Sequence, residues 1–349
     1  MQLDFWEQQL PFEYPFTISN GRTKTHQHSL MIRLSLGNWQ GYGEAPAIIY
    51  YNVTVEAMME LLEKNRKLIE KFALIDPERF WHFLHHLFPN HPFLVSAIDM
   101  AGWDLFGQMK KMPIHDIWNT PWNENTPTPI CDYTLGIDSI EKMVEKMKAH
   151  PWPIYKIKVG TDYDIEMITA LRAQTNAPLR LDANAGWTTE EALQKIPALA
   201  ALGVELVEQP LAKDNWEGMA QLKAASTIPL FADESCVFEK DVAVCASYFH
   251  GINIKLTKCS GLTPALRMIK EAKTLGLKVM MGSMNESVIG SAAIAQFLPQ
   301  LDYVDMDGPL LMTELNGIGL DYNMENNKGK IIPLQKPGLG VQFKMPFKK

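Results

Sequence analysis

The chain has 349 residues, of which 46% are hydrophobic and 21% charged, and its formal net charge is −7. A chain of this length can bury a large core, and the composition is ordinary for a globular protein. The acidic balance, without a basic patch, makes nucleic acid an unexpected partner. The sequence has no run of about 18 apolar residues, so we expect no membrane-spanning segment.

The first residues and the cysteines lead us to expect a cytoplasmic protein. MQLDFWEQQL carries acidic and glutamine side chains where a signal peptide needs a basic segment and a long apolar run. The spacing of the cysteines shows no pair such as CxxC, so we expect reduced, mostly buried thiols. The four cysteines are Cys131, Cys236, Cys245 and Cys259.

Residues 1–120 are predicted to form an N-terminal α+β domain. In HSLMIRLSLG, apolar residues recur at every second position from Leu30 to Leu36, which is the period of a half-buried strand. NWQGYGEA follows as a turn and another strand, which completes a small antiparallel sheet. From Thr54 to about Gln108 the apolar period becomes helical, with Thr54 as a candidate N-cap. A cluster of prolines then indicates a linker.

From Ile130 onward, short apolar runs alternate with amphipathic segments of helical length. The eight runs are ICDYTLG, IYKIKVG, PLRLDANAG, VELVEQP, PLFADES, GINIKLTK, LKVMMGSM and YVDMDGP. This alternation predicts a parallel sheet with helices outside, and eight units predict a closed (β/α) barrel within residues 121–315. The eighth helix is not evident, because DGPLLMTELNGIGLDYN has the character of a loop. Residues 316–349 are expected to return to the N-terminal domain.

Three carboxylates end neighbouring strands of this predicted barrel. Asp182, Glu208 and Asp233 close the third, fourth and fifth apolar runs, and active sites of such barrels lie at these strand ends. Three like charges that converge need a cation, and oxygen ligands favour a hard metal, Mg²⁺ above all. Taken singly, Asp182 and Asp233 could instead be N-caps, since each precedes a predicted helix.

Lysines on two further strands predict acid–base chemistry around this metal site. Lys156 and Lys158 lie two apart on the second strand and face the same side, and Lys255 lies on the sixth strand. The second and sixth of eight strands face each other across a barrel. A substrate on the metal would have one lysine on each face, so a proton next to a carboxylate or amide could leave one side and return on the other. A divalent cation would stabilise the intervening enolate.

Two more acids lie on the eighth strand. Asp305 and Asp307 are two apart, so they share a face and point toward the same end of the barrel. They could bind a cationic group of a substrate, such as an ammonium, or they could be solvated acids at a strand end. Beside the predicted metal site, we favour substrate binding.

Seven motifs together carry a resemblance to a known family. KIKVG, LDANAGW, VEQP, ADES, NIKLTKCSG, GSMNES and DMDGP resemble the enolase superfamily, and the KxK pair with a lysine on the sixth strand resembles its muconate-lactonizing subgroup. The segment Asp305–Met306–Asp307 is similar to the DxD of dipeptide epimerases of the Ala-Glu epimerase type. The resemblance implies a modified TIM barrel, an α+β capping domain with specificity loops, and an Mg²⁺-dependent isomerase.

The resemblance also implies roles for the matching residues. Lys158 and Lys255 would be the two bases that invert the α-carbon of the second residue of a dipeptide. Lys156 would contact a substrate carboxylate or amide oxygen and tune Lys158, while Thr134 and Ser283 would line the substrate. The two aspartates of the DxD would hold the dipeptide ammonium. The Mg²⁺ ligands would be Asp182, Glu208 and Asp233.

The preference for the second residue of the dipeptide stays open. Epimerases of the Ala-Glu type place a cation in an early loop to meet the glutamate side chain, and Arg22 and Lys24 are candidates for that cation. The apolar run over residues 48–51 could instead line a pocket for a hydrophobic side chain. The resemblance therefore leaves both an acidic and a hydrophobic second residue open.

Other activities use the same lysines and metal. The sequence leaves open an o-succinylbenzoate synthase, a muconate cycloisomerase or an N-acylamino acid racemase, although the DxD pair argues against substrates that lack an ammonium. A more remote alternative is a barrel that binds a ligand without turnover. The expected partner is a small-molecule dipeptide, with neither nucleic acid nor membrane, and assembly into a homo-oligomer stays open.

Overall fold

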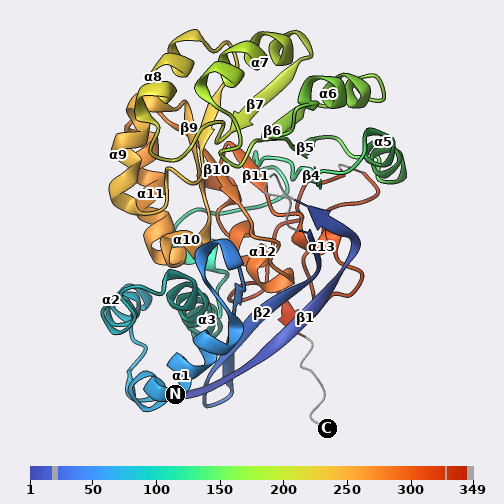
Figure 1. Ribbon diagram of the computed structural model, residues 1–349. Helices are drawn as coiled ribbons and strands as arrows, with labels where there is room; N and C mark the ends of the chain where they lie inside the picture. The colour runs from blue at the N-terminus through green and yellow to red at the C-terminus, as the bar shows by residue number, and fades with distance from the viewer. Residues whose placement is uncertain (18–22, 327, 344–349) are drawn as a thin grey trace.

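The structure is a computed structural model that describes residues 1–17, 23–326 and 328–343. Its strands form a three-stranded antiparallel sheet, an eight-stranded parallel sheet and a two-stranded ladder. In Figure 1 the parallel sheet and its helices occupy the upper part of the view, and the antiparallel sheet with three helices lies below. The predicted fold, a barrel with an α+β cap, is confirmed.

The cap is a sheet in the order β1-β2-β3, with helices packed on one face. Its elements are β1 (Gln2–Thr17), β2 (Thr23–Leu36), β3 (Trp39–Pro46), α1 (Val55–Lys71), α2 (Pro77–Leu87) and α3 (Pro92–Lys110). Leu30 and Ile32 of β2 are buried in the apolar cluster shared with these helices, while Met31 between them belongs to the cluster of the barrel. The sheet therefore lies between two cores. Thr54 caps α1, as predicted, and accepts a hydrogen bond from the backbone of Ala57.

Helix α3 lies directly against β3, and two glycines allow this approach. A Cβ atom at Gly43 would come within 1.9 Å of the carbonyl oxygen of Ala97, and one at Gly41 within 2.2 Å of the backbone nitrogen of Leu105. Any side chain at these two positions would push the helix away from the sheet. The close contact fixes the position of β3, which becomes important for the site.

The barrel strands follow the order of the chain from β4 to β11. They are β4 (Tyr133–Leu135), β5 (Tyr155–Lys158), β6 (Leu179–Asp182), β7 (Val204–Glu208), β8 (Leu230–Ala232), β9 (Gly251–Ile254), β10 (Lys278–Gly282) and β11 (Tyr303–Asp305). Neighbouring strands pair in parallel, and a parallel bridge between Cys131 and Val304 joins the first strand region to the last. The eight apolar runs of the sequence are thus the eight strands.

Helices cover the outside of the barrel, as Figure 1 shows. They are α5 (Ile140–Ala149), α6 (Asp164–Arg172), α7 (Thr189–Ala201), α8 (Trp216–Ala225), α9 (Glu239–Tyr248), α11 (Leu262–Thr274) and α12 (Val288–Ala295). The shorter helical segments are η1 (Ile49–Tyr51), α4 (Ile114–Ile117), α10 (Leu256–Cys259), η2 (Leu298–Gln300) and α13 (Gly308–Leu311). The eighth barrel strand is followed only by the single turn of α13, consistent with the loop character of its sequence.

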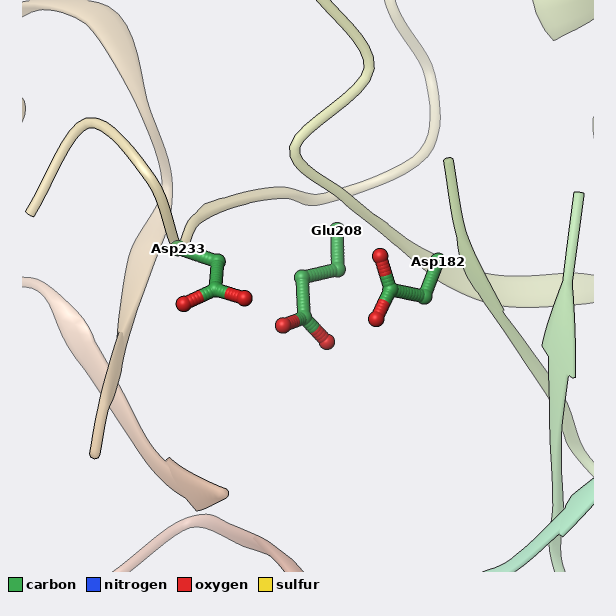
Figure 2. Close-up of side chains that lie close together, drawn as sticks. All are labelled: Asp182, Glu208 and Asp233. Carbon is green, nitrogen blue, oxygen red and sulfur yellow. The ribbon is translucent and has the colours of Figure 1, made fainter. Parts of the chain in front are cut away.

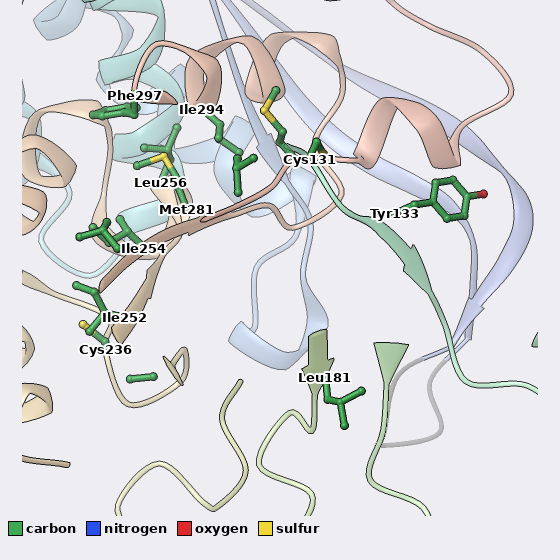
Figure 3. Packing of buried hydrophobic residues seen from close by; sticks show 14 of the residues in the cluster. Cys131, Tyr133, Leu181, Cys236, Ile252, Ile254, Leu256, Met281, Ile294 and Phe297 are labelled. Atoms are coloured by element: carbon green, nitrogen blue, oxygen red, sulfur yellow. The ribbon is translucent and has the colours of Figure 1, made fainter. Parts of the chain in front are cut away.

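Apolar side chains fill the space between strands and helices. Figure 3 shows Ile254 of β9 and Met281 of β10 in the same cluster as Ile294 of α12 and Phe297. These four side chains are almost completely buried. Close packing of this kind holds the strands in register and therefore fixes where each strand ends.

The C-terminal segment contacts both the cap and the barrel. The backbone nitrogen of Gly338 donates to the carbonyl of Met112, and that of Leu339 donates to Asp104 of α3 at 2.8 Å. Farther on, β12 (Gly317–Ile318) pairs with β13 (Gln342–Phe343). The ring of Phe343 lies 5.6 Å from that of Trp6 on β1.

The hairpin of β1 and β2 extends from the cap to the mouth of the barrel. Its register shifts between Pro11 and Phe16, and the carbonyl of Thr17 accepts a hydrogen bond from the backbone of Ile137, just after β4. The end of the hairpin is thereby fastened to the barrel. Phe16 and Lys24 are brought to the strand ends in this way.

Two further expectations concern the chain as a whole. In the described part of the chain, no helix has both the length and the apolar character that crossing a membrane requires. All four cysteines are free and buried, which confirms the prediction of unpaired thiols.

Candidate active site

Five charged side chains come from consecutive strand ends of the barrel. Lys158, Asp182 and Glu208 are the last residues of β5, β6 and β7, and Asp233 and Lys255 directly follow β8 and β9. The ladder pairs Lys158 with Asp182, and Asp182 with Glu208, so these three lie at one level. The sequence-predicted set is thus brought together at one end of the barrel.

The three carboxylates form a compact buried group. One oxygen from each of Asp182, Glu208 and Asp233 lies within 4.8 Å of the others. Figure 2 shows the three carboxylates pointing into a common space from neighbouring strand ends. All three side chains are buried. Three carboxylate oxygens so close together suit a hard divalent cation.

The alternative that Asp182 and Asp233 cap the following helices is not supported by the geometry. Helix α7 is capped by Thr188, whose hydroxyl accepts from the backbone of Glu191. Asp182 instead accepts from the backbone of Asn184 in its own loop. Helix α9 begins only after Phe238. Both carboxylates are therefore directed to the strand ends rather than to helix termini.

Each of the two predicted bases contacts one carboxylate of the group. The Nζ atom of Lys158 lies 2.6 Å from Asp182, and that of Lys255 lies 2.7 Å from Asp233. Burial disfavours the charge of Lys255, but Asp233 and Glu208 outweigh burial and raise the pKa of this lysine. Conversely, burial raises the pKa of Asp233, but Lys255 and other nearby ammonium groups lower it below the usual aspartate value. The ammonium of Lys255 and the carboxylate of Asp233 therefore stabilise each other's charged form.

Lys156 lies deeper in the barrel than Lys158. Its Nζ atom is 2.6 Å from Asp305, 2.8 Å from Glu208 and 3.2 Å from Asp182, and its side chain is only 3% exposed. Burial lowers its pKa, but the surrounding carboxylates, with Asp305 foremost, raise it well above the usual value. Through these contacts Lys156 links β11 to the carboxylate group.

The pKa of Glu208 reflects the repulsion between the like charges of the carboxylate group. Burial and the neighbouring charge of Asp182 raise the pKa of Glu208 to about 7, although Lys156 acts in the opposite direction. Asn253 donates a hydrogen bond of 2.6 Å to Glu208 and orients it. A bound cation would relieve this repulsion, so the residues present fit a metal ligand set.

A cavity of about 430 Å³ opens above these groups. Its barrel wall is polar and consists of Thr134, Lys158, Asn184, Asp233, Glu234, Lys255, Ser283, Asn285 and Asp305. The opposite wall is mostly apolar. The cap contributes Phe16, Thr23, Lys24, Ile48, Ile49, Tyr50 and Tyr51 to it, and the loop after β10 contributes Met284. A small molecule in the cavity would thus touch both domains, with its reactive centre near the lysines and carboxylates.

The remaining predicted substrate residues differ in their exposure to this cavity. Thr134, Ser283 and Asp305 line it. Asp307 is buried, and its carboxylate accepts a hydrogen bond of 2.6 Å from the backbone of Thr134. Burial and the charge of Asp305 raise the pKa of Asp307 to about 7.

One of the two predicted specificity cations lies in the cavity wall. The Nζ atom of Lys24 donates to the side-chain oxygen of Gln27 at 3.3 Å. Burial lowers its pKa, opposed by the charge of Glu286. Arg22 falls outside the described residues. The apolar run of residues 48–51 does line the cavity, next to Lys24.

Comparison with known proteins agrees with this geometry. A family model described as enolase C-terminal domain-like matches residues 138–347. An L-Ala-D/L-amino acid epimerase of Flavobacterium johnsoniae is 48% identical over 314 residues, which cover 90% of this chain and 92% of that protein. An L-Ala-D/L-Glu epimerase of Bacteroides thetaiotaomicron is 34% identical, with 98% of this chain and 88% of that protein covered. The chain belongs to the enolase superfamily.

Solved structures place this enolase-superfamily chain beside the dipeptide epimerases. The substrate-liganded L-Ala-D/L-Glu epimerase of Bacillus subtilis has a TM-score of 0.91 and 28% identity, with 99% of each chain covered. The dipeptide epimerase of Enterococcus faecalis, complexed with Mg and L-Leu-L-Tyr, has a TM-score of 0.89 and 28% identity, with 97% of this chain and 98% of that chain covered. The resemblance read from the strand-end motifs is thereby confirmed.

Three residues that no sequence pattern indicated, Gln209, Asn253 and Lys258, support the site. The side-chain oxygen of Gln209 accepts from the backbones of Asp233 and Ser235 and so holds the loop after β8. Asn253 orients Glu208, and Lys258 contacts both the carbonyl and the carboxylate of Asp233. Asn253 could have been found, because it lies two residues before Lys255 on the same face of β9. No periodic pattern in the sequence indicates the contacts of Gln209 and Lys258.

Proposed function

We propose that this protein is an Mg²⁺-dependent dipeptide epimerase in which Lys158 and Lys255 are the two bases. The observation that carries the proposal is that both ammonium groups line one cavity, from β5 and β9, on opposite sides of the carboxylate group held by β6, β7 and β8. The curated relatives named as epimerases of L-Ala dipeptides support the substrate class. The activity is that of an isomerase.

The carboxylate group of Asp182, Glu208 and Asp233 would hold the metal. Structures of similar dipeptide epimerases contain Mg together with a dipeptide, which supports the choice of ion. When bound, Mg²⁺ would compete with the ammonium groups for these oxygens and would stabilise negative charge that develops on a substrate oxygen.

The two lysines would divide the proton transfer between the faces of the α-carbon. One lysine, in its neutral form, removes the proton from the α-carbon of the second residue, and the electron pair moves toward the carboxylate to give an enolate. The opposite lysine, in its ammonium form, returns a proton to the other face. The product is the epimer, and each lysine has exchanged its protonation state.

Other side chains would orient the dipeptide. Asp305 in the barrel wall would accept the ammonium of the first residue, with Asp307 behind it holding Thr134 in place. Ser283 and Thr134 would offer hydroxyl groups to the peptide. Lys156 would hold Asp305 and Glu208 in position from below.

The cap wall favours a hydrophobic second residue. Phe16, Ile49 and Tyr50 offer apolar surface to the cavity. The ammonium of Lys24 already donates a hydrogen bond to Gln27 and is stabilised by the charge of Glu286. A leucine or an aromatic side chain would bury this surface, which is worth about 2 kcal/mol for a side chain of that size. We therefore propose L-Ala dipeptides with an apolar second residue as the preferred substrates.

The test is deuterium incorporation at the α-carbon in deuterated water. L-Ala-L-Leu, L-Ala-L-Phe and L-Ala-L-Glu would each be incubated with the protein, with Mg²⁺ or with a chelator. We expect exchange and epimerisation with Mg²⁺, no exchange with the chelator, and a higher kcat/KM for leucine and phenylalanine than for glutamate. No exchange with any dipeptide would overturn the proposal, and a preference for glutamate would overturn its specificity.

A further inference from the structure

A carboxylate of the cap reaches into the barrel at the edge of the cavity. Glu44 lies on β3, and its side chain is completely buried. It accepts hydrogen bonds from the hydroxyl of Ser29 on β2 at 3.0 Å, from the backbone of Ser287 at 3.0 Å and from the backbone of Gly290 at 3.2 Å. The hydroxyl of Ser287 also donates to it. One donor thus belongs to the cap, and the others belong to the barrel.

The barrel donors form the N-terminus of α12. The first backbone N–H groups of a helix lack partners within the helix, and its dipole favours a negative charge there. Here the anion comes from another domain. Gly290 leaves room for the neighbouring side chain of Glu286, because a Cβ atom at this position would come within 2.4 Å of that side chain. Asn316 of the C-terminal segment donates to Ser287 at 2.8 Å, so a third part of the chain joins the same point.

The loop that precedes α12 supplies part of the cavity wall. Ser283, Met284 and Asn285 line the cavity between β10 and this helix. Asn285 has a left-handed backbone with φ of 64°, which costs free energy unless the surroundings hold it. The buried carboxylate of Glu286 accepts from the backbone of Met284 and stiffens the loop from within. The end of the loop next to α12 is held by the hydrogen bonds that Ser287 donates to Glu44.

A buried carboxylate gives this contact a fixed geometry. Burial raises the pKa of Glu44, so an ionised group here needs all of its donors. An apolar contact would tolerate sliding of the cap on the barrel, whereas several donors of fixed direction define one position of the loop relative to β3.

We propose that Glu44 is a positioning residue that couples the cap to the β10–α12 loop and thereby sets the affinity for substrate. The proposal rests on the proposed function for its substrate, a dipeptide. Glu44 does not line the cavity, so its effect reaches the substrate through Ser283 and Met284. Proton transfer by the lysines on β5 and β9 is expected to proceed as before once substrate is bound.

The kinetic test compares Glu44→Gln with a matched variant, Asp104→Asn. Asp104 on α3 is also a buried carboxylate that accepts two backbone N–H groups, those of Tyr42 and Leu339, but it touches no residue of the cavity wall. Glu44→Gln is expected to raise KM about fivefold to tenfold, the equivalent of one net hydrogen bond, with kcat within about twofold. Asp104→Asn is expected to lower Tm with KM unchanged. An unchanged KM in Glu44→Gln, or an equal rise in both variants, would overturn the proposal.

Amide hydrogen exchange provides a readout that needs no substrate. Glu44→Gln should speed exchange in residues 283–290 while leaving the loop after β6 unchanged, and Asp104→Asn should leave both regions unchanged. If Glu44→Gln does not fold, Ser287→Ala removes one donor and should accelerate exchange in the same segment. Faster exchange together with inactivity of the wild type toward dipeptides would retain this inference and refute the proposed function. Unchanged exchange in residues 283–290 would refute the inference alone.

Discussion

The two walls of the cavity are built on different physical principles. The barrel wall places Lys158, Asp233 and Lys255 at strand ends, where each charge is buried and has an opposite charge within 2.7 Å. The cap wall presents apolar side chains that stay accessible, with Ile49 65% and Tyr50 54% exposed. The barrel wall thus holds paired charges in fixed positions, and the cap wall offers apolar surface to a side chain. Chemistry and selection should therefore respond to different mutations.

The largest effect is expected from Glu208, the proposed metal ligand that lies buried beside the barrel wall. Glu208→Gln keeps the shape of the side chain and removes its charge, so it should lower kcat/KM at least about a thousandfold and raise the Mg²⁺ concentration needed for half-maximal activity. The measurement is turnover as a function of Mg²⁺. Glu191→Gln, in the exposed capping box of α7, serves as the control and should behave like the wild type. A wild-type Mg²⁺ dependence in Glu208→Gln would contradict the metal assignment.

A smaller and selective effect is expected from Asp305. Asp305→Asn removes the charge that we propose to face the dipeptide ammonium, so kcat/KM for a free dipeptide should fall about tenfold to a hundredfold. The same dipeptide with an acetylated amine lacks the ammonium and should lose much less. An equal loss for both substrates would mean that Asp305 acts through Lys156 and not through the substrate.

The cap wall should alter selection with little effect on the chemistry. Tyr50→Ala should lower kcat/KM for L-Ala-L-Phe about tenfold, mainly through KM, because aromatic contact area is lost. L-Ala-L-Ala, which is too short to reach this wall, should be turned over as before. Ile75→Ala removes another exposed apolar side chain, away from the cavity, and is the control. An equal loss of kcat/KM for both dipeptides in Tyr50→Ala would show that the cap wall does not act on selection alone.

The smallest functional effect is expected from a buried carboxylate remote from both walls. Asp99 on α3 accepts hydrogen bonds from the backbone and hydroxyl of Thr263. Burial outweighs these bonds and raises the pKa of Asp99 to about 7. A raised folded-state pKa means that the protonated form stabilises the fold at low pH and that this contribution is lost as pH rises toward 7.

The wild type should therefore lose on the order of 3 kcal/mol of unfolding free energy, relative to Asp99→Asn, between pH 4 and pH 7. Denaturant unfolding of both proteins across this range measures the difference. A constant difference would show that Asp99 is ionised throughout. Epimerase activity at a fixed pH should be the same in both proteins.

The parts of the fold that could be predicted from sequence are those with a regular period. The eight barrel strands are short apolar runs, and each strand-end residue follows its run directly, so Asp182, Glu208 and Lys255 could be placed together. The first strand of the cap was not singled out, because QLDFWEQQLPFEYPFT is rich in polar residues and contains prolines, which weaken a strand signal.

Long-range contacts leave no regular period in the sequence. Glu44 lies in GYGEA, where the positions that face α3 are Gly41 and Gly43. Because α3 lies directly against these glycines, this strand lacks the apolar side chains that would mark its buried face. The partners of Glu44 in the barrel, Ser287 and Gly290, are more than 240 residues away, so only the folded chain joins them. The position of Asp307 behind Thr134 is of the same kind, since it depends on how β11 and β4 meet across the closure of the barrel.

Deuterium wash-in by single lysine variants tests the central claim most directly. Lys158→Ala and Lys255→Ala would each be given the L,L and L,D epimers of one dipeptide in deuterated water with Mg²⁺. Lys195→Ala, which loses a lysine paired with buried Asp164 on the outside of the barrel, is the control. We predict that each active-site variant loses exchange from one epimer and keeps it from the other, and that the two variants lose exchange from opposite epimers. Equal loss from both epimers in both variants would contradict the assignment of the two lysines to opposite faces.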